Sequence, residues 1–141
     1  MITSKEIIHI ILCTDENYII PCGITIFSIC YNNKHSRLFF HILSEGVSSC
    51  KKTDIKSLVE AYGQQIKFYD VNSALIGNVP VNNRFRISIY YRLLMANILP
   101  KNISKILYLD SDIIVRGNLQ EIWETDITNK ALGAVLDQSC D

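Results

Sequence analysis

The chain has 141 residues, of which 48% are hydrophobic and 20% charged, a composition typical of one globular domain with a sizeable core. Fourteen basic residues balance fourteen acidic ones, which excludes a global electrostatic attraction for nucleic acid or for an anionic membrane. We expect no transmembrane segment and no signal peptide, because no apolar run is long enough. Five cysteines without a C-x-x-C pair predict reduced thiols and a cytoplasmic location.

Short apolar runs alternate with helical patterns along the chain. In order, the sequence predicts a strand at Ile7–Leu12, a helix at 21–33, a strand at Leu38–Leu43, a helix at 48–62, a strand at Gln65–Tyr69, a loop at Asn72–Asn83, a helix at Ile89–Leu99, a strand at Ile106–Leu109 and a strand at Ala131–Leu136. Pro21 suits a first helical turn, Ser48 or Ser49 can cap the second helix, and Gly63 is its stop. This β-α-β succession predicts a mostly parallel sheet flanked by helices.

Polar side chains follow several of these strands. Ligands of open α/β sheets bind beyond the carboxyl ends of the strands, so residues distant in sequence can meet there. The candidates are Asp15, Asn17, Asp70, Asp110, Asp112 and Asp137. No G-x-G-x-x-G follows the first strand and no P-loop motif occurs, which argues against a dinucleotide redox enzyme and a P-loop NTPase.

The stretch Lys105–Val115 carries the strongest chemical signal. An apolar run delivers Asp110 and Asp112 to its carboxyl end, and side chains at i and i+2 of an extended strand project to the same side. Paired hard oxygen ligands suit Mg²⁺ or Mn²⁺, which keep coordination positions open for phosphate oxygens. The alternative is a solvated turn in which both acids are turn formers.

Three segments in their order resemble the family 8 glycosyltransferases, retaining enzymes of the galactosyltransferase and glycogenin type. They are I-L-C-T-D-E-N-Y (Ile11–Tyr18), I-Y-Y-R-L (Ile89–Leu93) and I-L-Y-L-D-S-D-I-I-V-R-G-N-L (Ile106–Leu119), and Trp123, Asp126 and A-V-L-D (Ala134–Asp137) continue the pattern. The resemblance implies a nucleotide-diphospho-sugar transferase fold (GT-A, Rossmann-like). It also implies a metal-dependent hexosyltransferase of polysaccharide or lipopolysaccharide biosynthesis, with a UDP-glucose or UDP-galactose donor, Mn²⁺ or Mg²⁺, and a saccharide acceptor.

The resemblance also assigns roles by position. Asp15 and Asn17 would contact the uridine, Tyr18 would lie on the uracil face, Asp110 and Asp112 would hold the metal on the diphosphate with Asp110 near the ribose, Arg92 would reach the donor sugar or phosphate, and Asp137 would accept sugar hydroxyls. The groups closest to the chemistry would be Asp112, Arg92 and Asp137. A phenol offers stacking area and a guanidinium fork suits phosphate, so the residue types are compatible with these roles.

Family members run well beyond this length. The resemblance therefore implies that residues 1–141 are the amino-terminal, donor-binding part of one glycosyltransferase domain. The acceptor part, with a further metal-binding histidine and any peripheral membrane contact, would then be absent. Two alternatives are a non-catalytic nucleotide-sugar binding module and a haloacid-dehalogenase-like phosphatase. In the phosphatase the D-x-D normally follows the first strand, whereas Asp110 follows the fourth.

Other conspicuous side chains have structural interpretations. Trp123 is expected in the core, and His9 and His41 lie within strands at no metal-ligand spacing. Ser111 has no basic partner nearby and is not a credible nucleophile. A solvated loop explains Arg84 and Arg86 as well as a diphosphate or acceptor contact does.

Overall fold

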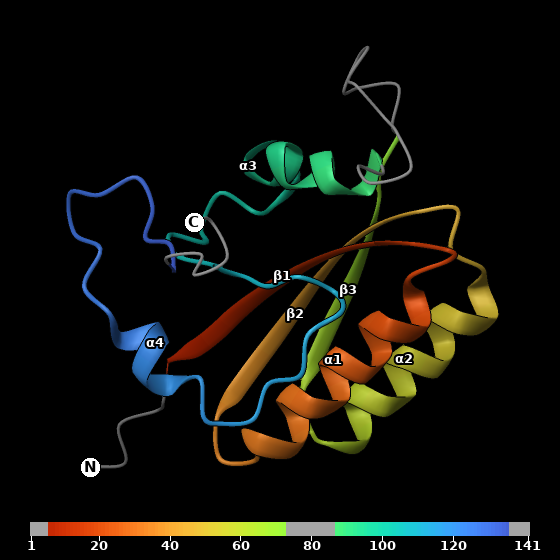
Figure 1. The fold of residues 1–141 in the computed structure, drawn as a ribbon, viewed down its shortest axis with the longest axis horizontal. Coiled ribbons are helices and arrows are strands. Elements are labelled where there is room, and N and C mark those ends of the chain that lie inside the picture. Colours follow the sequence, from red (N-terminus) through yellow and green to blue (C-terminus); the bar gives the residue numbers. More distant parts are fainter. Residues whose placement is uncertain (1–5, 73–86, 136–141) are drawn as a thin grey trace, which may run out of the picture.

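The structure is a computed structural model and describes residues 6–72 and 87–135. Its centre is a parallel sheet of four strands in the order β3-β2-β1-β4 (Figure 1). The strands are β1 (Ile7–Asp15), β2 (Arg37–Glu45), β3 (Gln65–Asp70) and β4 (Leu107–Tyr108). The prediction of a parallel, helix-flanked sheet is confirmed, and β1 extends three residues past the predicted end to Asp15.

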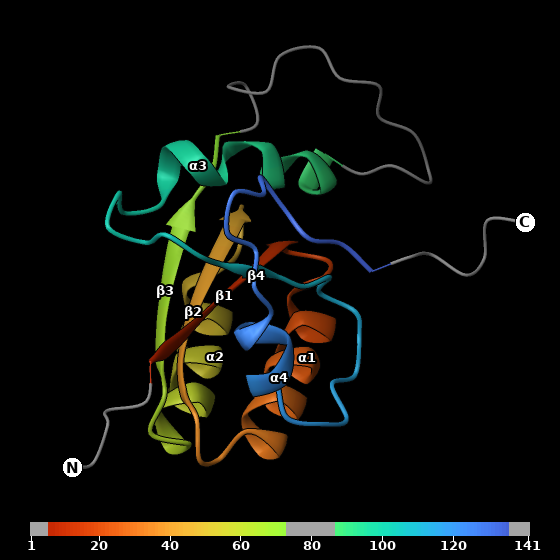
Figure 2. The same cartoon turned by 90° about the vertical axis from the view of Figure 1, so that its left-hand side faces the viewer.

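Helices cover the sheet differently on its two faces. Helices α1 (Ile19–Asn32) and α2 (Ser49–Ala61) lie side by side on one face, with α4 (Gln120–Glu124) packed into the same core through Trp123. The 3₁₀ helix η2 (Ile87–Leu94) and the short α3 (Met95–Ile98) cross above the carboxyl ends of the strands (Figure 2). They pack against the other face of the sheet, around Ile11 and Leu43.

The apolar sequence of β1 and β2 follows from their position in the sheet. Both are interior strands with a neighbour on each side and helices on each face, so side chains of both parities are buried. Ile8 and Ile10 belong to the core beneath α1 and α2, whereas Ile11 belongs to the core beneath η2. Trp123 is 4% exposed, which confirms its predicted place in the core.

Three predicted elements are wrong in part. Strand β4 is limited to Leu107–Tyr108, because among the described residues it pairs only with β1. The segment predicted as one helix at Ile89–Leu99 is mainly 3₁₀, and its tighter repeat of three residues per turn brings Tyr91 and Leu94 onto the same core. Residues 131–135 are irregular and exposed, since no described strand pairs with them; Leu136 lies outside the described residues.

The helix ends agree with the sequence signals except at one cap. Pro21 lies in the first turn of α1, and Gly63 follows α2 with φ +67°, a left-handed conformation that suits glycine. Ser48 is the residue that precedes α2, but its hydroxyl makes no capping hydrogen bond. Its backbone N–H instead donates to Glu16 Oε2 at 3.0 Å.

The irregular segment that follows β4 is held by side chains of α1. Thr25 Oγ1 donates to the carbonyl oxygen of Ile113 at 2.8 Å, and the N–H of Val115 donates to Ser28 Oγ at 3.0 Å. Two asparagines at the end of the helix continue the contacts as far as Leu119, whose N–H donates to Asn33 Oδ1 at 2.7 Å. Polar side chains on α1 and at its end thus form hydrogen bonds with backbone groups of this segment, which pairs with no described strand.

A hydrogen-bonded chain crosses three strands on the η2 face of the sheet. His9 Nδ1 lies 3.0 Å from His41 Nε2, and His41 Nδ1 lies 3.0 Å from the hydroxyl of Tyr69. His41 is 2% exposed, and burial lowers its pKa to about 4, with further lowering by His9 and Lys67. His41 is therefore neutral in the folded protein, where it links neighbouring strands.

We predict that His41 makes the fold acid-sensitive. In the unfolded chain its pKa is about 6.5, so below that pH the unfolded state binds a proton that the folded state does not. Stability is complete above about pH 6.5 and falls by at most about 3 kcal/mol as the pH drops to about 4. Urea unfolding between these pH values should show a shallower pH dependence for His41→Gln than for the parent. The exposed-histidine control His35→Gln should follow the parent; equal slopes for all three chains would contradict the prediction.

Candidate nucleotide-sugar site

The candidate site lies where the direction of strand order reverses. From β1 the chain adds β2 and then β3 on one side, whereas β4 pairs with β1 on the other side. In open parallel sheets this switch point leaves a crevice beyond the carboxyl ends of the two strands. Asp15 ends β1 and Asp110 follows β4, so both acids lie at the edge of the sheet where such a crevice is expected.

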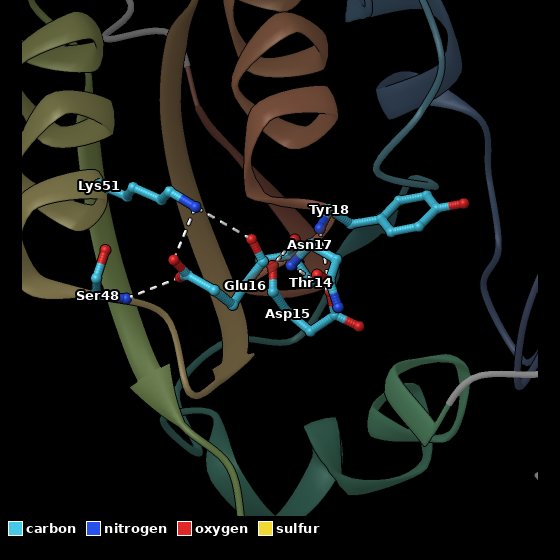
Figure 3. Close-up of polar contacts among 7 residues, drawn as sticks. All are labelled: Thr14, Asp15, Glu16, Asn17, Tyr18, Ser48 and Lys51. Atoms are coloured by element: carbon cyan, nitrogen blue, oxygen red, sulfur yellow. Dashed lines mark hydrogen bonds and ion pairs between the residues drawn. The ribbon is translucent and has the colours of Figure 1, made fainter.

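The loop between β1 and α1 is shaped by Asp15. One of its carboxylate oxygens, Oδ1, accepts the backbone N–H of Asn17 at 2.9 Å and that of Tyr18 at 3.0 Å. These bonds turn the chain at the start of α1 and leave Tyr18 37% exposed. In Figure 3 the Tyr18 ring points away from the polar cluster of the loop. Asp15 thus has a structural function in addition to its predicted contact with uridine.

Glu16 fixes the same loop to α2. Its Oε1 lies 2.7 Å from Lys51 Nζ and its Oε2 accepts the N–H of Ser48 at 3.0 Å (Figure 3). The hydrogen bond from Lys51 holds the pKa of Glu16 below its usual value, with the Ser48 N–H adding to the effect. The loop that presents Asn17 and Tyr18 is consequently anchored on two elements, β1 and α2.

The D-S-D turn is anchored through its central serine. Ser111 is 8% exposed, and its hydroxyl donates to the carbonyl oxygen of Cys13 at 2.6 Å. Asp110 and Asp112 on either side are exposed. The turn therefore directs its serine inward and leaves both carboxylates accessible.

Two neighbours hold the carboxylate of Asp110 in position. Tyr108 donates its phenol to Asp110 Oδ1 at 3.0 Å, and Arg92 Nη2 lies 3.8 Å from the same oxygen. The Arg92 guanidinium also stacks 4.6 Å from the centroid of the Tyr108 ring. Burial raises the pKa of Tyr108 above its usual value, so this phenol stays protonated and donates. Arg92 offsets part of the repulsion between two nearby acids.

The element that carries Arg92 is fixed by its neighbour Tyr91. Tyr91 is fully buried, and its hydroxyl donates to Glu45 Oε2, at the end of β2, at 2.6 Å. Burial and the hydrogen bond to Glu45 raise the pKa of Tyr91, so the phenol remains a donor. Arg92 is thereby held over β4 from an element attached to β2.

The predicted site residues divide into three groups. Asp15, Asn17 and Tyr18 lie at or just after the end of β1, Asp110 and Asp112 follow β4, and Arg92 of η2 lies beside Asp110; because β1 and β4 are neighbours, these six lie at one edge of the sheet. Asp70 is not among them, because β3 lies two strands from β1 and the Asp70 carboxylate pairs with Lys52 of α2. Asp137, Arg84 and Arg86 lie outside the described residues.

The donor set at the crevice suits a metal that is shared with phosphates. Within residues 6–72 and 87–135, no three or more His, Cys, Asp and Glu side chains are grouped to hold a metal ion. Asp110 and Asp112 nevertheless offer two accessible hard oxygen ligands. Mg²⁺ and Mn²⁺ at nucleotide sites use one or two carboxylates together with phosphate oxygens, so the pair fits a metal bound with a diphosphate.

Four residues with positioning roles were missed in the sequence: Glu16, Tyr91, Tyr108 and Ser111. The i, i+2 relation on an extended strand could have placed Tyr108 on the same side as Asp110. Ser111 could have been recognised in the same way as the one residue of the turn that points inward. The partners of Glu16 and Tyr91 lie 35 and 46 residues away, and no local pattern indicates such contacts.

The fold is the nucleotide-diphospho-sugar transferase (GT-A, Rossmann-like) fold, as two solved structures show. A glycosyltransferase LgtC, in the crystal structure of an active-site mutant, superposes with a TM-score of 0.86 and 29% identity over 92% of this chain and 46% of that chain. Galactosyltransferase LgtC in complex with donor and acceptor sugar analogues superposes with a TM-score of 0.79, again at 29% identity, over 85% of this chain and 43% of that chain.

The chain belongs to glycosyl transferase family 8, whose model matches residues 9–141. A lipopolysaccharide 1,2-glucosyltransferase of Escherichia coli is 31% identical over 134 residues, which are 95% of this chain and 40% of that protein. A lipopolysaccharide 1,3-galactosyltransferase of Salmonella typhimurium is 25% identical over 86% of this chain and 36% of that protein. The chain thus spans less than half the length of these relatives. Membership of a glycosyltransferase family disagrees with the phosphatase alternative.

No helix in the described part of the chain is long and apolar enough to span a membrane.

We predict that Ser111 positions the D-S-D turn. Ser111→Ala removes the hydrogen bond to the Cys13 carbonyl oxygen and should cost about 1 kcal/mol in the free energy of unfolding. Because the turn is then less well held, affinity for UDP in the presence of Mn²⁺ should also fall several-fold. Urea unfolding and calorimetric titration measure the two effects. Ser57→Ala, on the exposed side of α2, is the matched control and should change neither quantity; unchanged binding in Ser111→Ala would limit the residue to stability.

Proposed function

We propose that this chain is the donor-binding part of a metal-dependent hexosyltransferase that uses UDP-glucose or UDP-galactose and retains the anomeric configuration. The observation that carries the proposal is the meeting of Arg92 and Asp110 beside the end of β1. A cation and a pair of acids at a switch point suit a diphosphate that is bound both directly and through a metal. Family membership supports transfer of a sugar from such a donor.

The nucleoside would bind on the loop between β1 and α1. The amide of Asn17 and the carboxylate of Asp15 can recognise imide and hydroxyl groups. The Tyr18 ring is partly exposed at the start of α1, and a flat phenol provides stacking area for a base at small entropic cost. The double anchoring of the loop by Asp15 and Glu16 supports a preformed surface for the base.

The diphosphate would bind between Arg92 and the D-S-D turn. Asp110 and Asp112 would hold Mn²⁺ or Mg²⁺, and Arg92 would contact the donor phosphate or sugar. When bound, the metal neutralises negative charge on the UDP leaving group. Tyr108 and Arg92 hold the Asp110 carboxylate in place before any ligand arrives. Asp137, which lies outside the described residues, is proposed as an acceptor for sugar hydroxyls.

The acceptor is inferred from the relatives. Two of them are named as lipopolysaccharide glucosyl- and galactosyltransferases, which favours a saccharide acceptor. Galactosyltransferase LgtC was solved with donor and acceptor sugar analogues, and this favours a common cleft for both. A cytoplasmic enzyme fits these substrates. We further propose that the amino-terminal donor part is represented here and that the acceptor wall belongs to residues beyond this chain.

A non-catalytic nucleotide-sugar binding module remains the second candidate, since the chain spans 40% of the glucosyltransferase it matches. Both candidates require UDP-sugar binding, and only the first requires transfer. Calorimetric titration of UDP-glucose and UDP-galactose with and without Mn²⁺ tests what they share. A transfer assay on a protein that spans the full length of the relatives then separates them: binding without transfer would identify the module.

We predict that Asp112→Asn abolishes most metal-dependent UDP binding and leaves the fold intact. The substitution removes one of two proposed ligands together with a charge that repels Asp110, so the metal-free variant should be at least as stable as the parent. Titration of UDP with Mn²⁺ measures the binding and thermal unfolding measures the fold. Asp54→Asn, which replaces an exposed acid on α2, should bind like the parent. If Asp112→Asn bound Mn²⁺ and UDP as tightly as the parent, the proposed metal site would be wrong and the two acids would only form the turn.

We predict that Tyr18 contributes stacking energy for the base. Tyr18→Ala should weaken binding of UDP and of uridine alike by on the order of 1 kcal/mol, the scale of base–aromatic stacking. Tyr18→Phe keeps the ring and should bind almost like the parent, and neither change should alter the metal dependence. Competition titrations with uridine, UMP and UDP provide the measurement. An unchanged affinity for uridine in Tyr18→Ala would refute the assignment.

A further inference from the structure

Helix α1 exposes a stripe of large apolar side chains. Ile20, Ile24, Phe27 and Tyr31 are 60%, 52%, 45% and 54% exposed, although the opposite face of the helix lies in the core. The helical spacing of apolar residues predicts this helix from the sequence, yet three of those residues, Ile24, Phe27 and Tyr31, face solvent. Contiguous exposed apolar surface of this kind is typical of an interaction site.

The stripe has the geometry of a helix-pairing seam. Its spacings of four, three and four residues are those of the a and d positions over two heptads, the narrow seam by which helices pair. No Asp, Glu, Lys or Arg occurs in α1. The Phe27 ring centroid lies 5.9 Å from that of Tyr31 and 6.2 Å from that of Tyr62 of α2, so the aromatic half is preformed.

The neighbouring elements flank the stripe and leave it open. On one side α1 packs against α2, where Ile55 lies so close that a Cβ on Gly23 would meet it at 2.6 Å. On the other side the segment 113–119 runs along the helix, hydrogen-bonded to Thr25 and Ser28 (Figure 2). The helix is therefore rigidly held on three sides and presents its fourth to solvent.

We propose that a second copy of this chain docks on this stripe, with the two α1 helices antiparallel about a two-fold axis between Ile24 and Phe27. In that register Ile24 of each copy faces Phe27 of the other, and Ile20 faces Tyr31. Each aromatic ring then meets an isoleucine of the other copy. A self-complementary patch is what an isologous two-fold interface requires.

The charges at the helix ends favour a second copy over a lipid surface. Asp15 and Glu16 precede α1, with Lys51 balancing one of them, whereas Lys34 and Arg37 follow it with no acid before Glu45. Antiparallel docking brings the basic end of one copy to the acidic end of the other and pairs the helix dipoles favourably. A membrane-surface helix instead carries Lys and Arg along its polar face, and α1 has none.

The interface is small and leaves the donor crevice accessible. Complexes that bury less than roughly 1,200 Å² in total are usually weak. We expect a contact between two single helices to bury less than that, so the dimer should be reversible and concentration-dependent. Antiparallel helices of this length place the two β1–α1 loops about 20 Å apart along the helix axis.

The test is the oligomeric state of the 141-residue chain by sedimentation velocity between about 10 μM and about 500 μM. We expect a concentration-dependent dimer, and Phe27→Glu should weaken association at least tenfold without changing the circular dichroism spectrum. Leu132→Glu is the matched control: Leu132 is 72% exposed and lies outside α1, so this variant should dimerise like the parent. A monomeric parent at all concentrations, or equal association of all three chains, would overturn the proposal.

Cross-linking tests the antiparallel register. In a Cys50→Ser, Cys140→Ser background, a chain with Ile20→Cys is mixed with a chain with Tyr31→Cys and oxidised. The expected product is the mixed disulfide, because the register places these positions opposite each other, and Phe27→Glu in both chains should remove it. Products that join like positions would overturn the antiparallel docking. Binding of anionic vesicles that is lost in Phe27→Glu, by a chain that stays monomeric, would assign the stripe to a lipid surface instead.

Discussion

The attachment of β4 to β1 is the constraint on which the candidate site depends. The ladder between them comprises only two residue pairs, too few to hold the D-S-D turn on their own. Hydrogen bonds beyond the ladder complete the attachment: the N–H of Leu109 donates to the Ile11 carbonyl oxygen at 3.1 Å, and Ser111 donates to that of Cys13. The acids are thus placed by contacts that continue the strand after its regular part has ended.

The charge distribution at this edge depends on that placement. Asp110 and Asp112 are brought beside the end of β1, where Asp15 and Glu45 also lie, so several carboxylates share one edge of the sheet. Their mutual repulsion is reduced locally by Arg92 and by hydrogen bonds from Tyr91 and Tyr108. Phenols with raised pKa values donate hydrogen bonds to these carboxylates without adding charge.

The sequence predicts the interior of this fold better than its edges. Strands β1 to β3 and helix α2 follow from local periodicity and from stop signals such as Gly63. Strands β1 and β2 have a strand on each side, and β3, at the edge of the described sheet, pairs with β2 along its whole length. Strand β4 and residues 131–135 depend on which backbone lies beside them, and periodicity carries no such information. Asp70 shows the same limit: it follows a strand as predicted, but the order of strands places it roughly 10 Å from β1.

The side chains of helix α1 have different roles on three sides of the helix. Its isoleucines at 19, 26 and 29 fill the core, its small polar residues Thr25 and Ser28 receive the segment after the D-S-D turn, and its remaining apolar side chains face solvent. A charged residue on the polar side would lose the hydrogen bonds that hold this segment, and a larger residue at Gly23 would meet Ile55. Packing thus explains the absence of charge on these sides of the helix, but it does not explain the uncharged apolar side chains on the solvent side, and the proposed docking of a second copy accounts for them.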